Sequence, residues 1–190
     1  MFPFSWHAFL RHRISLTYNI CVSHISDDAF IILTQRLKNM RPVLVCAFIR
    51  FACNSLPTND RLHDELFASC PVCGDSTGSI IHIISCHALF SRASDIVRVR
   101  GGILFVSSGG GLQHPLITHG TPTVPSFAEH VSMRLGLSAV SLPSFRLLLI
   151  QLFVVQQAFT ALRRSCCSSC TIASAEQLDA VMHAAVLSLA

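Results

Sequence analysis

Three cysteines and one histidine in the middle of the sequence have the spacing of a metal site. They are Cys70, Cys73, His82 and Cys86, which read as Cys-x2-Cys-x8-His-x3-Cys. Two cysteines separated by two residues can wrap a tight turn around one ion, and Pro71 and Gly74 favour that turn. Three sulfurs and one imidazole form a closed tetrahedral set that suits Zn²⁺. Because no position is left for water, we expect structural rather than catalytic zinc.

A plainer interpretation treats the four residues as unrelated members of a cysteine-rich chain. The sequence has nine cysteines among 190 residues, so a single Cys-x2-Cys pair can arise by chance. The proline and glycine of the first pair, and the His-x3-Cys at zinc-finger distance after it, favour the metal site. His87 directly follows Cys86 and is a rival ligand.

We call these four residues the Cys/His cluster. Helices are predicted before the cluster and over its second half. His82 and Cys86 are four apart, so one helix would carry both on the same face, one turn apart. Ser79 can cap that helix, and its isoleucines predict that it is buried. Three further helices are predicted in the first hundred residues. They run from Ser26 to about Met40, from Val43 to Asn54, and over a short stretch after Pro57.

The residues around the cluster extend the pattern. Leu56-Pro57-Thr58 and Arg61-Leu62 precede Cys70-Pro71-Val72-Cys73-Gly74, and Ser79 precedes the His-x3-Cys pair. Residues 40–95 resemble the zinc-binding region (zf-RVT) that lies C-terminal to the polymerase in non-LTR retrotransposon reverse transcriptases. The resemblance implies a structural zinc ion, assistance in engaging template RNA or target DNA, and a reverse transcriptase body or another protein as a partner.

Charge and cysteine content suggest the surroundings in which the chain works. The net charge is +4, and Lys38 is the one lysine among 14 basic residues. Arginine suits phosphate contacts better than lysine does, although a skewed codon composition would give the same bias. The basic residues nearest the cluster, and our candidates for phosphate contact, are Arg50, Arg61 and Arg92. Many cysteines without a persuasive signal peptide predict an intracellular location, in the cytoplasm or nucleus.

No catalytic pattern stands out in the sequence. A polymerase needs paired aspartates in a Tyr-x-Asp-Asp type of turn, and Asp27-Asp28 reads instead as the start of a helix. Neither an HExxH sequence nor a Ser-His-Asp or Cys-His nucleophile spacing is evident. Together with this absence, the resemblance described above implies a non-catalytic fragment of a reverse-transcriptase-type polyprotein.

The whole chain is predicted to be mostly α-helical. The predicted division is a poorly defined N-terminal arm at 1–25, a helical zinc-binding domain at 26–100, a Gly/Pro-rich linker at 101–125 and a C-terminal helical segment at 126–190. Cys167 and Cys170 form a second Cys-x2-Cys, but it lacks proline and glycine and is not expected to bind metal.

The stretch from Leu142 to Arg164 is the most hydrophobic in the chain. Arg146 and several glutamines interrupt it, which favours a buried helix or a partner surface over a membrane span. The stretch supports an alternative function, in which the chain is a helical protein-interaction or membrane-associated protein and its cysteines are incidental. A membrane partner is not expected under the main interpretation.

Overall fold

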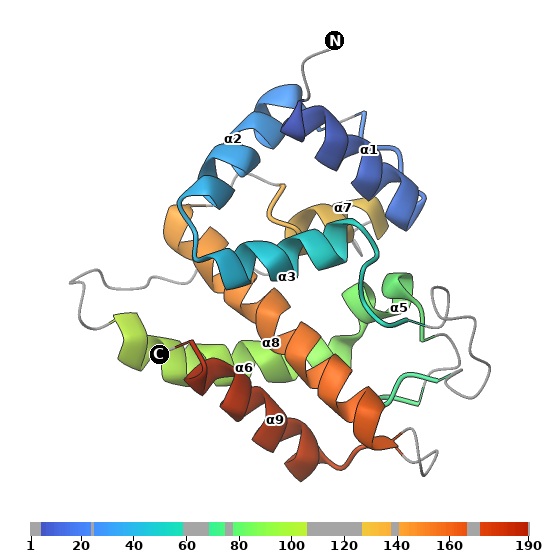
Figure 1. Ribbon diagram of the computed structural model, residues 1–190, viewed down its shortest axis with the longest axis vertical. Helices are drawn as coiled ribbons and strands as arrows, with labels where there is room; N and C mark the ends of the chain where they lie inside the picture. Colours follow the sequence, from blue (N-terminus) through green and yellow to red (C-terminus); the bar gives the residue numbers. More distant parts are fainter. Residues whose placement is uncertain are drawn as a thin grey trace, which may run out of the picture.

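The computed structural model describes residues 5–23, 25–58, 69–74, 78–105, 127–137, 141–166 and 172–189. Within these ranges the chain is helical and has no strand, which confirms the predicted mostly α fold. The helices, shown in Figure 1, are α1 (Trp6–Tyr18), α2 (Asp27–Lys38), α3 (Pro42–Ala52), α5 (Ile80–Ser85), α6 (His87–Phe105), α7 (Phe127–Arg134), α8 (Leu142–Cys166) and α9 (Ala175–Leu187).

Helix α8 runs through the middle of the molecule and packs against α3, α6 and α9 (Figure 1). Side chains on several faces of α8 are buried, as expected of a helix that is surrounded by other helices. Those with no exposed surface are Phe145, Leu149, Leu152, Val154, Val155, Ala158 and Phe159. By length and composition Leu142–Ser165 could also cross a membrane, a test that a buried core helix passes as well.

Local signals in the sequence account for several helix starts. Ser26 caps α2, its Oγ accepting a hydrogen bond from the Ala29 N–H at 3.2 Å. Pro42 is the first residue of α3, where its missing N–H costs no helical hydrogen bond. Ser174 and Gln177 form a capping box at the start of α9. The starts at Ser26 and Pro42 agree with the predicted helices.

The N-terminal region differs from the prediction. Residues 6–18 form helix α1 rather than part of a poorly defined arm. Ser5 caps the helix, and Leu10, Ile14 and Tyr18 recur every four residues to give one buried face.

Helix α1 satisfies the exposed backbone end of α3. The last carbonyls of a helix have no partner within it and need one elsewhere. Side chains of α1 donate to three consecutive carbonyls: Tyr18 to Phe51 at 3.1 Å, Thr17 to Ala52 at 3.0 Å, and Arg13 to Cys53 at 3.0 Å. The two helices are therefore held together by polar contacts as well as by their apolar faces.

The predicted linker is partly wrong, because α6 continues through residues 101–105 before the described range ends. The remainder of that linker, like the short helix predicted after Pro57, lies outside the described residues. Buried side chains from α1 through α9 form one hydrophobic core. The core joins segments that the prediction placed in separate domains, and the proposed boundaries remain predictions about independent folding.

Candidate metal centre

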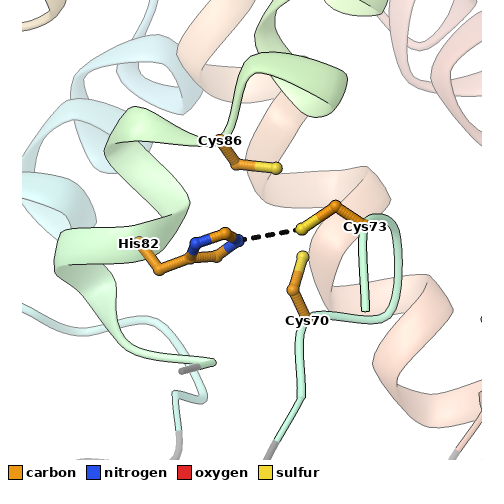
Figure 2. Close-up of side chains that lie close together, drawn as sticks. All are labelled: Cys70, Cys73, His82 and Cys86. Atoms are coloured by element: carbon orange, nitrogen blue, oxygen red, sulfur yellow. Dashed lines mark hydrogen bonds between the residues drawn. The ribbon is translucent and has the colours of Figure 1, made fainter. Parts of the chain in front are cut away.

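The first two cysteines of the cluster lie on a tight turn. The Gly74 N–H donates to the Cys70 carbonyl at 3.0 Å and closes the turn around Cys73. Gly74 has a φ of +74°, a left-handed conformation that glycine adopts without a steric penalty. Cys70 is buried and Cys73 is exposed, so the turn joins the core to the surface. Figure 2 shows both sulfurs directed toward the same space.

Helix α5 positions the histidine of the cluster. Ser79 caps the helix, its Oγ accepting from the His82 N–H at 3.1 Å. Ile80, Ile83 and Ile84 are buried and fix this one-and-a-half-turn helix against the core. The half-buried His82 ring consequently faces the cysteine turn (Figure 2).

Cys86 is not in the helix that carries His82, so the prediction of one continuous helix was wrong. Helix α5 ends at Ser85, and Cys86 is its C-cap with an extended backbone of φ −62° and ψ 103°. Ser85 Oγ donates to the carbonyls of Ile81 and His82, and the Cys86 N–H donates to the Ile83 carbonyl at 3.3 Å, which closes the last turn of α5. Helix α6 begins at the next residue, and Cys86 sits at the bend between the two helices.

The four side chains nevertheless converge. Their ligand atoms all lie within 4.8 Å of one another, and Cys73 Sγ is 3.2 Å from His82 Nε2 (Figure 2). Around a tetrahedral Zn²⁺ with bonds of about 2.3 Å, two sulfurs are separated by about 3.8 Å. The observed spacing fits one metal ion with small side-chain adjustments. Within the described ranges this is the one group of histidine, cysteine or acidic side chains gathered closely enough to hold a metal ion.

Cys70 and Cys86 form a hydrogen bond through their sulfurs. The Cys86 thiol donates a hydrogen bond to Cys70, and this bond is the largest cause lowering the pKa of Cys70 to about 5. Burial opposes the shift, while the N–H groups of Cys73 and Val72 add to it. The same sulfur–sulfur bond, with burial, raises the pKa of Cys86. A lowered pKa favours the thiolate of Cys70, the form in which cysteine binds metal.

Other predicted or rival cysteines and histidines lie apart from the cluster. His87 is exposed, and its ring is hydrogen-bonded to Ser91 Oγ at 3.2 Å. Cys46 and Cys53 lie in the apolar α3 region of the sequence, which predicts small buried side chains. Cys46 is instead exposed and Cys53 half-buried. Cys167 and Cys170 lie outside the described residues.

The three arginine candidates for phosphate contact are placed differently. Arg50 is exposed in the last turn of α3. Arg92 on α6 forms an ion pair with Asp179 on α9, through two hydrogen bonds to its carboxylate. Arg61 lies outside the described residues.

A segment far along the chain completes the cysteine turn. The Ala173 N–H donates to the Pro71 carbonyl at 2.8 Å. Ile172, just before it, packs against Gly74. Sequence reasoning did not find this contact, because nothing in the sequence around Ile172 and Ala173 indicates where that segment folds back.

Comparison of the chain with protein-family models, with curated proteins and with solved structures returns no match. The case for function therefore depends on the residues and their geometry.

Proposed function

We propose that Cys70, Cys73, His82 and Cys86 bind one structural Zn²⁺. The single observation that carries this proposal is the convergence of their four ligand atoms to within 4.8 Å. Three sulfurs and one nitrogen suit zinc better than magnesium or calcium, which prefer oxygen. The protein supplies all four tetrahedral positions, so the ion would hold the turn at Cys70 against α5 and α6.

Elemental analysis of protein purified under reducing conditions tests the metal site. We expect about one zinc per chain, as for a Cys₃His site, and a loss of helicity by circular dichroism when a strong chelator is added. Cys73→Ser should remove the zinc. Cys46→Ser is the matched control, because Cys46 is an exposed cysteine outside the cluster. A metal-free wild-type chain, or zinc retained by Cys73→Ser, would refute the site.

We further propose that this zinc-stapled helical module associates with nucleic acid. Support comes from the net charge of +4, the preference for arginine, and the resemblance of residues 40–95 to the zinc-binding region of retroelement reverse transcriptases. The exposed Arg50 is best placed to contact phosphate, whereas Arg92 is already paired with Asp179. The chain would work as a non-catalytic part beside a polymerase body.

Binding of labelled single-stranded RNA and of duplex DNA, measured over a range of salt concentrations, tests this second step. Each phosphate contact contributes about one to the slope of log affinity against log salt. Arg50→Met should reduce the slope by about one, while Arg92→Met should change it less. Chelation should abolish binding. The association would be refuted if the affinity did not depend on salt, or if the zinc-loaded chain bound neither nucleic acid. Neither result would contradict the metal site.

A further inference from the structure

A cavity of about 540 Å³ lies between α1, α2 and α3. Its walls are mainly apolar and include Trp6 and Leu10 from α1, Leu37 from α2, and Val45 and Ile49 from α3. Sites for small organic molecules typically measure about 300–1,000 Å³ and are lined by apolar side chains with a few polar groups. The cavity has the size and lining of such a site.

Most polar groups around the cavity are already hydrogen-bonded to their own helix or to each other. Thr34 Oγ1 donates to the Ile31 carbonyl at 2.8 Å. Ser5 Oγ bonds the His7 ring at 2.9 Å and accepts from the Ala8 N–H. These groups therefore have little hydrogen-bonding capacity left for a ligand.

Lys38 is different. It lines the cavity from the last turn of α2 and is exposed. Among the described residues, no hydrogen bond or ion pair engages its ammonium group. An apolar chamber beside an unpaired cation is complementary to a molecule with an apolar body and a single negative charge.

We propose that this cavity binds a small apolar carboxylate of the medium-chain fatty acid class. The hydrocarbon body lies among the apolar side chains of α1 and α3, and the carboxylate meets the Lys38 ammonium. Trp6, which is 54% exposed at the wall, becomes covered when the ligand enters. None of the lining residues belongs to the Cys/His cluster, so the proposal stands independently of the zinc site.

Trp6 is the one tryptophan of the chain, so its fluorescence reports directly on this wall. We would titrate the full chain with decanoate at submicellar concentrations and, in parallel, with uncharged decanol. Decanoate should produce a saturable blue shift as its chain displaces water from the indole. Decanol should bind more weakly. Absence of a saturable shift with decanoate would overturn the proposal.

Three variants locate the site. Lys38→Met should weaken decanoate binding about two- to five-fold, the effect of an exposed ion pair, and leave decanol binding unchanged. Arg98→Met is the matched control, because it removes one exposed positive charge on α6. Val45→Phe, with its helicity checked by circular dichroism, should fill the cavity and weaken both ligands. Equal effects of Lys38→Met and Arg98→Met, or unchanged binding in a folded Val45→Phe, would overturn the proposal.

Discussion

Ile172 packs against Gly74 so closely that a β-carbon added to Gly74 would lie 2.8 Å from Ile172 Cδ1. Gly74 also has a positive φ of +74°, which is unfavourable for residues with side chains. We expect Gly74→Ala to lower the free energy of unfolding by about 1–2 kcal/mol from the backbone. The steric loss should be smaller, because the contacting atom is the tip of an exposed side chain that can shift. Chemical denaturation of the two proteins measures the difference.

A second substitution separates the two contributions. Ile172 is 60% exposed, so Ile172→Ala by itself should change stability little. In the double variant Gly74→Ala/Ile172→Ala, the steric loss of stability should disappear and the backbone loss should remain. A Gly74→Ala protein as stable as the wild type would contradict the turn described around Cys70 and Cys73.

Ser79 and Ser174 offer a matched pair of helix caps, of which only Ser79 starts the helix that carries a ligand of the cluster. Ser79→Ala and Ser174→Ala should each lower the free energy of unfolding by about 1 kcal/mol. Only Ser79→Ala should also weaken zinc affinity, because the first turn that orients His82 loses its cap. Competition with a chromophoric chelator measures this affinity. Equal zinc affinity in both variants would show that the cap does not position His82.

Tyr18 is buried and donates to the Phe51 carbonyl at 3.1 Å. Tyr18→Phe should lower the free energy of unfolding by about 1 kcal/mol at neutral pH, since one buried hydrogen bond is lost. Burial raises the pKa of the Tyr18 phenol above its ordinary value of 10.0, with a smaller contribution from Cys53. The protonated form is therefore favoured in the folded state, and its contribution to stability is complete below pH 10.0 and falls as pH rises further.

Denaturation at a series of alkaline pH values checks this dependence. Tyr18 is the one tyrosine of the sequence, so its absorbance can be followed without interference from another tyrosine. The wild type should lose stability above its unfolded-state pKa more steeply than Tyr18→Phe does. A phenol that ionises at its ordinary pKa while the protein remains folded would contradict the burial of Tyr18 between α1 and α3.

The ion pair of Arg92 with Asp179 links α6 to α9 and should be sensitive to acid. The hydrogen bonds from Arg92, and then its charge, lower the pKa of Asp179 below its ordinary value of 3.8. The contribution of the pair is present above pH 3.8 and is lost as pH falls through the lower folded-state value. Asp179→Asn should therefore be slightly less stable than the wild type at neutral pH, and this difference should shrink as the pH falls below 3.8.

Asp95→Asn is the control for that comparison. Asp95 is exposed and pairs with Arg98 only at 3.5 Å, within one helix turn. Asp95→Asn should change the melting temperature little at neutral or at acidic pH. If Asp179→Asn behaves in the same way, the contact between α6 and α9 is apolar alone.

Short-range signals made much of the helical fold predictable. Ser26, Pro42 and Ser174 mark helix starts through interactions with residues two to four positions away, which a sequence displays directly. The spacing from Cys70 to Cys86 likewise specifies a set of donors through the order of the residues alone. The convergence of the four ligand atoms agrees with that spacing, whereas the identity of the ion remains a prediction.

The parts that were missed depend on contacts between distant segments. The exposure of Cys46 follows from which face of α3 meets α8, and residue type alone does not specify that face. The break at Cys86 places an isoleucine-rich helix and the longer α6 in different directions, although the residues favour a helix throughout. The cavity at Lys38 is formed by side chains of three helices, so no local pattern in the sequence indicates it.

The hydrogen bond from Ala173 to Pro71 has a consequence for the order of assembly. Its two residues are separated by about a hundred positions, and contacts of such high separation form late because a long loop must close first. During synthesis all four ligands emerge from the ribosome well before Ala173 does. The proposed zinc ion could therefore bind before the core is complete, and Ile172 and Ala173 would then close over the occupied turn. On this proposal, a nascent chain arrested before residue 172 would exchange its ion faster than the finished protein does.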